Sequence, residues 1–396
     1  FELLDSGSPD GGLQGFSGGI AWLPGGGTSG VELQLERRSF ERTLTGAESG
    51  SRSRVVLGGR VGVGDAAQAA AWIGESEREL DGAAGEEGDA PSPAVTHGGV
   101  ELRARWDRVW GTVGGRFAGG EALPERELSA EGGARPFPWL VLSAGGRAGS
   151  LDGLDTSEGR LAAAGRFELL GASARLHAEV AGGTRGVPYL ATDSVGADTV
   201  GFSALAGGAE LDLGPVRVGG RAARQEVDRQ LAFGTGFDLA GGARSGVEVR
   251  SLEATVDLPV LPLSWLLDTA DPIRLRGFVR HNSVAAGDTA LYVPTNVLRG
   301  ELYFEDSFLE GDLGVRLGLG LDRRDSWPTA PGPGGEGAPV VVPSRTSLDF
   351  DLGLRIVGVL IYWRYDNVAG RLQSDLPGFE FPVLRQVFGI RWQFFD

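Results

Sequence analysis

Charged side chains of both signs recur at every second position in several segments of this chain. The members of this charged set are Arg103, Arg105, Arg175, Glu179, Arg274, Arg276, Arg280, Arg299, Glu301, Glu310, Asp312, Arg316, Asp349, Asp351 and Arg355. Alternate residues of a strand point to the same face. If that face lines a narrow aqueous path, the set is lumen-lining and its fixed charges bias which solutes enter. If the charges only pair with one another, they keep an interior hydrated, and the sequence leaves both interpretations open.

The three histidines give little support for catalysis. His97, His177 and His281 are scattered along the chain, and His177 lies between Arg175 and Glu179, where an ion-paired polar residue is expected. A hydrolase needs His held against a Ser or Asp partner, and no spacing here selects such a pair. We therefore expect no enzyme activity and no cofactor.

One acidic segment has the composition of a weak calcium site. Asp152, Asp155 and Glu158 lie within the nine residues Leu151–Gly159. Calcium favours clustered carboxylates in a flexible loop. A solvated acidic turn is the alternative interpretation, and we expect no other metal.

Composition excludes several classes of protein. All 37 basic residues are arginine, since the sequence contains neither lysine nor cysteine. Without lysine there is no P-loop, and without cysteine there is no disulfide, thiolate metal site or lipid-carrying cysteine. The net charge of −16 argues against nucleic acid as a partner. Because the chain begins at Phe1 and contains no Met, we expect an exported protein whose signal peptide has been removed.

The elements that carry these residues are short and two-faced. Segments of about ten residues alternate between apolar and polar positions and are separated by Gly, Pro and acidic residues, which is typical of strands and turns. The longest apolar run, Leu258–Leu267, is half of the roughly 20 residues that a spanning helix needs. A membrane protein of this kind must be a closed barrel. A soluble β-sandwich would show the same alternation, and it remains the alternative.

Connection lengths favour the barrel. Long polar stretches such as Asp322–Arg345 and Gly182–Thr199 alternate with tight links at Leu170–Gly171, Gly214–Pro215 and Val357–Gly358. The sequence predicts an all-β fold, a transmembrane antiparallel up-and-down β-barrel of about 16–18 strands with long extracellular loops and short periplasmic turns. Residues 1–29 are expected to form a Gly-rich N-terminal arm or first strand, and residues 30–396 a single barrel.

The last segment has the clearest alternation. Phe388, Ile390, Trp392 and Phe394 fall on one face, opposite Gly389, Arg391 and Gln393. This segment resembles the closing strand that bacterial outer-membrane barrels present to the barrel-assembly machinery. The resemblance implies that outer-membrane lipid and that machinery are partners.

The C-terminal third is similar to the last strands of TonB-dependent receptors. The matching residues are Pro343, Arg345, Leu348, Asp349, Asp366, Asn367, Pro377, Gly378, Phe379 and Pro382. The resemblance implies a barrel and an outer-membrane address. Members of the family also carry a plug domain and an energy-coupling box, for which Phe1–Gly30 offers no counterpart, so active uptake is not carried over.

Two functions are compatible with these expectations. The first is porin-like passive passage of small polar solutes through a charged lumen. The second is a structural or interaction barrel closed by its own loops, which anchors a surface assembly or pairs with another copy. The connection Arg323–Ser344, with its Pro/Gly-rich middle, is the loop expected to fold inward or to bind a neighbour in the second case.

Overall fold

The computed structural model covers most of the chain. It describes residues 2–8, 11–22, 30–43, 47–63, 66–81, 95–119, 124–169, 171–191, 194–233, 239–263, 271–285, 289–329, 339–370, 373–376, 379–381 and 384–392. Most of these residues lie in strands. No helix in these ranges is long and apolar enough to cross a membrane.

The chain forms two compact units. Unit 1 comprises Gly11–Gly165 and Ala178–Leu205, and unit 2 comprises Glu2–Asp10, Arg166–His177 and Ala206–Asp396. Strands β10, β11 and β12 contribute residues to both units. Twenty of the described strands belong to one antiparallel sheet, in which β1–β17 are joined by β20, β21 and β24.

The strands of unit 1 follow the chain from neighbour to neighbour. They are β2 (Gly11–Trp22), β3 (Gly30–Thr43), β4 (Ala47–Val63), β5 (Ala67–Asp81), β6 (Val95–Trp106), β7 (Val109–Gly119), β8 (Pro124–Phe137) and β9 (Leu140–Leu151), with most of β10 (Leu154–Leu169), β11 (Ala172–Ala191) and β12 (Ser194–Leu213). Each strand from β2 to β9 pairs antiparallel with the next one. This is an up-and-down arrangement.

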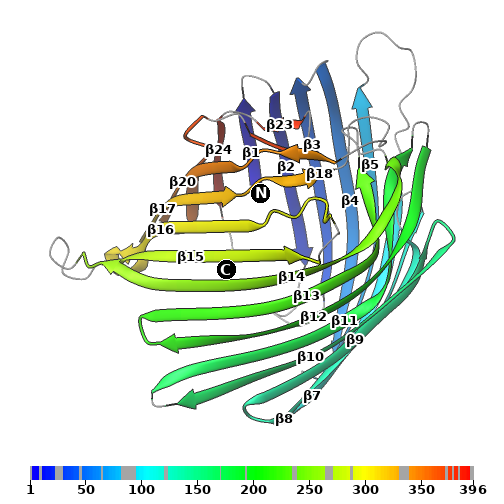
Figure 1. Cartoon of the computed structure of the whole chain (residues 1–396), viewed down its shortest axis with the longest axis horizontal. Helices are drawn as coiled ribbons and strands as arrows, with labels where there is room; N and C mark the ends of the chain where they lie inside the picture. The colour runs from blue at the N-terminus through cyan, green and yellow to red at the C-terminus, as the bar shows by residue number, and fades with distance from the viewer. Residues whose placement is uncertain are drawn as a thin grey trace. The chain divides into compact units, whose positions relative to one another are not determined.

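Unit 2 repeats the pattern. Its elements are β1 (Glu2–Ser8), β13 (Val216–Phe233), β14 (Leu239–Leu261), β15 (Ile273–Val284), β16 (Asn296–Phe308), the 3₁₀ turn η2 (Leu309–Gly311), β17 (Leu313–Arg324), β18 (Trp327–Thr329), β19 (Val340–Val342), β20 (Arg345–Ile356), β21 (Val359–Asp366), β22 (Gln373–Leu376), β23 (Phe379–Phe381) and β24 (Arg385–Trp392). Figure 1 draws β13 to β17 as neighbouring arrows of alternating direction. The last strand, β24, pairs with β21 on one side and with β1 on the other.

One face of the sheet is apolar and uncovered. In unit 2, Leu317 and Leu319 on β17 are 44% and 50% exposed, and in unit 1 Leu102 on β6 is 60% exposed. A β-sandwich would bury these side chains against a second sheet. Only nine apolar side chains are buried among the described residues. The structure therefore contradicts the sandwich alternative, and an exposed apolar face of this extent is typical of contact with lipid.

Tight turns connect the strands at one end of the sheet. β12 and β13 are joined by Gly214 and Pro215, and β20 and β21 by Val357 and Gly358, as the sequence predicted. Gly214 has a φ of +74°, a conformation that glycine adopts without strain. The connection between β16 and β17 is also short, and Glu310 within it has a φ of +58°.

Two expectations about strands are wrong. In the described part of the chain the main sheet contains 20 strands instead of about 16–18. The predicted long loop Gly182–Thr199 lies mainly in β11 and β12, which leave only residues 192–193 between them. Glycine and alanine provide weak alternation in such segments, so a strand there resembles a loop in the sequence.

The connection after β17 contains a small two-stranded sheet. β18 pairs with β19, and Trp327, Thr329 and Val342 in this small sheet are at most 4% exposed. The backbone N–H of Tyr292, in the preceding connection, donates to the carbonyl of Pro328 at 2.8 Å. The Pro/Gly-rich middle of this predicted loop, residues 330–338, lies outside the described residues.

Candidate functional site

The polar face of unit 2 is assembled from strands β13 to β17 and β20. Antiparallel registers place Asp257 of β14 opposite Arg276 of β15, and Arg276 opposite Glu301 of β16. On the next pair, Glu305 of β16 lies opposite Arg316 of β17. Because directly opposed residues point to the same face, each register step brings an arginine beside a carboxylate.

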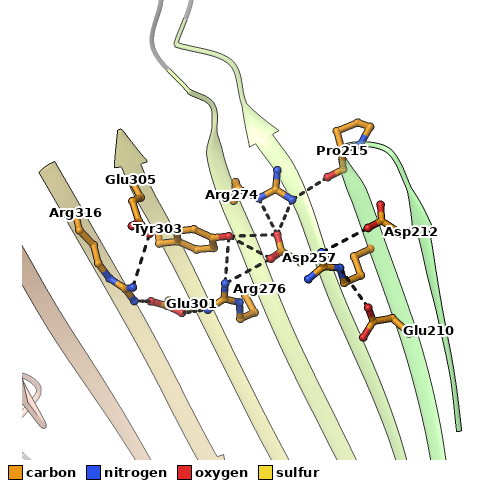
Figure 2. A network of polar contacts seen from close by, with 11 residues as sticks. Glu210, Asp212, Pro215, Asp257, Arg274, Arg276, Glu301, Tyr303, Glu305 and Arg316 are labelled. Atoms are coloured by element: carbon orange, nitrogen blue, oxygen red, sulfur yellow. Dashed lines mark hydrogen bonds and ion pairs between the residues drawn. The ribbon is translucent and has the colours of Figure 1, made fainter. Parts of the chain in front are cut away.

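Asp257 is the centre of the first network (Figure 2). Arg274 Nε donates to its Oδ1 at 2.8 Å, and Arg274 Nη2 forms an ion pair with the same oxygen at 2.8 Å. The hydroxyl of Tyr303 donates to its Oδ2 at 3.2 Å, and Arg276 Nη2 lies 3.6 Å from the same oxygen. The guanidinium of Arg276 also lies over the Tyr303 ring, 4.8 Å from its centroid. Arg274 Nη2 donates in addition to the carbonyl of Pro215 at 2.8 Å, which ties the network to the β12–β13 turn.

Arg316 is the centre of the second network. It contacts Glu301 at 3.0 Å, Asp351 at 3.2 Å and Glu305 at 3.9 Å. Glu301 is shared with Arg276 at 3.5 Å, so the two networks are continuous across the five strands β14, β15, β16, β17 and β20. A guanidinium offers five donors in a fixed plane, which allows one arginine to hold several carboxylates.

Neighbouring strands extend the ion pairs toward the turns. Arg217 of β13 lies 3.4 Å from Glu210 and 3.5 Å from Asp212, both on β12. Arg175 of β11 lies 3.3 Å from the same Glu210. Each of these carboxylates therefore has an arginine partner.

Further ion pairs lie toward the long connections. Arg280 donates to Glu253 at 2.7 Å, and Arg221 lies 3.7 Å from the same carboxylate. Arg299 donates to Asp322 at 2.8 Å. The polar face thus holds balanced charges, a result that favours mutual pairing over a strongly selective ring.

Unit 1 has its own ion pairs. Glu158 contacts Arg147 and Arg185, each at 2.8 Å. Arg160 lies 3.0 Å from Glu179. These pairs join β9, β10 and β11 within unit 1.

Some members of the predicted charged set lie apart from these networks. Glu310 and Asp312 belong to the turn between β16 and β17, so placing them on a strand face was wrong. Asp349 accepts a hydrogen bond from Ser347 at 2.7 Å instead of an ion pair. Among the described residues, neither Arg105 nor Arg355 has an ion-pair partner.

Sequence reasoning missed several residues that the networks require. Chief among them are Glu210, Arg217, Glu253, Asp257 and Tyr303. Glu253 and Asp257 alternate with Leu252, Ala254 and Val256, so the period-2 signal was present in the sequence. The adjacent apolar run with two prolines concealed it.

The calcium prediction is contradicted. Asp155 and Glu158 are three positions apart in β10, so they lie on opposite faces of the strand. Glu158 is held by its two arginines, and Asp152 lies in the preceding turn. Within the described ranges, no three His, Cys, Asp or Glu residues are grouped as metal ligands.

The histidines are separated as expected. His281 Nδ1 lies 2.9 Å from Asn296 Oδ1. The ring of His177 packs against the backbone of Gly208, and the ring of His97 against Gly74. The Nε2 atom of His97 is buried and has no hydrogen-bond partner in the described part of the chain.

The last strand has the two faces that the sequence predicted. Phe388 and Ile390 are 37% and 45% exposed on the apolar face, whereas Gly389 is buried on the other. The ring of Trp363 packs on Phe388 with 5.1 Å between centroids. Trp392 ends β24, and Phe394 lies outside the described residues. Recognition of this strand by the barrel-assembly machinery stays a prediction.

Comparison with solved structures places the fold. No protein-family model and no curated protein matches the chain. The siderophore receptor PirA from Acinetobacter baumannii is 10% identical with a TM-score of 0.61, covering 99% of this chain and 80% of its own. The FrpB iron transporter from Neisseria meningitidis is 10% identical with a TM-score of 0.65, covering 96% and 72%. The copper transporter OprC is 12% identical with a TM-score of 0.63, covering 97% and 71%. These structural neighbours are TonB-dependent receptor barrels, and the likeness is one of fold.

Proposed function

We propose that the chain is a closed outer-membrane β-barrel that passes small polar solutes along its ion-paired face. The observation that carries this proposal is the division of the sheet into an exposed apolar face and an opposite face of paired charges. Two adjacent residues of β17 illustrate this division of the sheet. Leu319 is half exposed among leucines, and Gly320 lies beside Asp349 on the opposite face. Lipid suits the first face and water the second.

Closure is supported by the pairing of the last strand. β24 has a hydrogen-bonded neighbour on each side, β21 and β1. A sheet edge left unpaired in lipid costs several kcal/mol for each free backbone group, on the order given for buried polar groups. The similar solved structures, which include a siderophore receptor and metal transporters, support the outer membrane as the location and transport as the class of function. In that setting the lipid contacts the apolar face and the assembly machinery binds β24.

Passive passage is proposed because the charges on the polar face are locally balanced. The Asp257 and Arg316 networks pair each charge with an opposite one, so a polar solute meets alternating dipoles instead of a single-sign barrier. Gly318 allows the Asp351 carboxylate to lie against the backbone of β17, since a Cβ at that position would overlap it. No enzyme activity is included in this proposal.

Two measurements test the proposal. The refolded protein should migrate faster in SDS gels before boiling than after, because an intact barrel resists the detergent. Planar bilayers containing it should show stepwise conductance. Heat-independent migration would contradict the barrel, and an intact barrel without conductance would contradict passage.

The alternative, a structural or interaction barrel closed by its loops, is favoured by one observation. The connection after β17 folds into the β18–β19 sheet with Trp327 and Thr329 buried. If this connection obstructs the path, deleting Pro331–Ala338 should raise conductance. Unchanged conductance would exclude this connection as the barrier.

A further inference from the structure

A second charged region lies in unit 1, at the tight-turn ends of β4 to β9. A cavity of about 850 Å³ opens there on the polar face. Its charged lining residues are Arg60, Arg103, Arg105, Asp107, Arg108 and Arg135. We refer to this cavity as the basic pocket.

The charge of the basic pocket is opposite to that of the chain. Five of its lining residues are arginines and one is an aspartate, whereas the whole chain has a net charge of −16. The arginines come from β4, β6, β8 and the β6–β7 turn, segments up to 75 positions apart between Arg60 and Arg135. Such a concentration of one sign raises the local potential for anions.

The five arginines of the basic pocket differ in their ion pairs among the described residues. Arg103 Nε contacts Glu101 at 2.5 Å, and Arg108 Nε lies 3.7 Å from Asp107. Within the described part of the chain, Arg60, Arg105 and Arg135 make no ion pair. The polar face of unit 2 differs, because its networks surround arginines with carboxylates.

Backbone contacts hold two of these arginines at the cavity. The N–H of Arg105 donates to the carbonyl of Ala66 at 2.7 Å, and the N–H of Arg135 donates to that of Arg108 at 2.7 Å. Trp110 forms part of the wall, and its indole lies where a Cβ of residue 133 would be, so Gly133 is required for its position. The pocket therefore has fixed walls on at least two strands.

We infer that the basic pocket binds a small multivalent anion carrying phosphate or carboxylate groups. Guanidinium groups bind both through paired N–H donors, and unpaired ones gain most from doing so. A role in transport rests on the proposed function, in which the pocket would retain anionic solutes at the tight-turn end. Binding itself requires only the folded chain.

Calorimetry on the full chain in a zwitterionic detergent tests the inference. Inorganic pyrophosphate and citrate serve as phosphate and carboxylate probes at low ionic strength. We expect one site for at least one probe, weakened at least about 10-fold by the triple variant Arg60→Gln, Arg105→Gln, Arg135→Gln. Tighter binding of pyrophosphate assigns phosphate as the preferred group, and tighter binding of citrate assigns carboxylate.

A matched triple variant controls for net charge. This control removes the same charge from the other face of the strands, by Arg224→Gln, Arg250→Gln and Arg323→Gln. It should change the affinity for the probes less than about 2-fold. No binding by the unmodified chain would overturn the inference. Equal weakening by both triple variants would also overturn it, because it would show non-specific attraction.

Chemical protection gives a second measurement without substitutions. Phenylglyoxal modifies accessible arginines, and peptide mass spectrometry locates the products. Pyrophosphate or citrate should protect Arg60, Arg105 and Arg135 but not Arg224. Uniform labelling with and without both probes would overturn the inference. Absent conductance with intact binding and protection would contradict only the proposed function.

Discussion

Ile390 in the last strand lies opposite Leu3 in the first strand, and the two are Cα partners in an antiparallel register. On its other side Ile390 lies opposite Ile361 of β21. The last strand thus has no free edge, which is the condition for a strand to remain in lipid.

An engineered disulfide should report this pairing. Directly opposed residues in antiparallel strands have Cα atoms about 4.5–5.5 Å apart, within the range that a disulfide spans. Because the chain has no cysteine, the double variant Leu3→Cys, Ile390→Cys should form one cross-link on mild oxidation, detected by mass spectrometry of the linked peptides. The pair Leu3→Cys, Leu319→Cys is the control and should not cross-link. Equal yields from the two pairs would contradict the β1–β24 register.

Arginine should destabilise the protein far more at Leu319 of β17 than at the adjacent Gly320. Leu319 is half exposed on the apolar face, whereas Gly320 has ordinary space for a Cβ beside Asp349. Leu319→Arg should lower the free energy of unfolding by about 2–4 kcal/mol, the cost of arginine near mid-membrane. Gly320→Arg should cost much less, because its charge meets carboxylates. Urea unfolding from lipid vesicles measures both, and similar losses would mean that the faces are assigned wrongly.

Ile390→Arg should carry the same lipid penalty of about 2–4 kcal/mol in the last strand. Gly389 is not a neutral comparison, because a Cβ there would overlap the ring of Tyr362. Arg391→Gln, on the polar face, is the matched control. The yield of folding into lipid vesicles is measured for the unmodified chain, for Ile390→Arg and for Arg391→Gln. An equal loss of yield in both variants would contradict the assignment of Ile390 to the apolar face.

Gly389 and Tyr362 should be coupled. Gly389→Ala forces the Tyr362 ring away and should destabilise the protein by about 1–3 kcal/mol, as overpacking does. Tyr362→Ala should remove most of that extra cost. A double-mutant cycle by urea unfolding measures the coupling. Additive losses would show that the ring does not lie on Gly389 in the membrane.

Asp257→Asn should affect both stability and ion preference. It leaves Arg274 and Arg276 without their shared carboxylate. Because these arginines are partly exposed, the loss should be about 1–2 kcal/mol. The reversal potential in a KCl gradient should shift toward anions, since one negative charge leaves the polar face.

Glu226→Gln is the control for this shift. Glu226 lies on β13, on the face opposite to that of Arg217, and contacts Arg224 at 3.5 Å. The substitution removes the same charge from this other face, and the reversal potential should stay unchanged. Equal shifts from both variants would show that net charge alone sets the preference.

The two-faced character of the strands was determined by the sequence alone. Alternation in Leu309–Leu321 and in the last strand predicts which side chains share a face. The structure confirms the last strand and the part of the first segment from Leu313 to Leu321, whereas Leu309–Gly311 form a turn. Alternation is local, because successive side chains of any strand point to opposite sides. For the same reason Gly- and Ala-rich segments, which alternate weakly, were read as loops and the strand count was too low.

Which charges meet was decided only by the tertiary structure. Arg316 contacts Glu301 on the preceding strand and Asp351 beyond a connection of 20 residues, from Asp325 to Ser344. The basic pocket likewise gathers arginines from four segments. These contacts depend on the register between neighbouring strands, and a shift of one residue would move every partner to the other face. Register is set by turns such as Leu309–Asp312, whose backbone conformation the residue types alone do not specify.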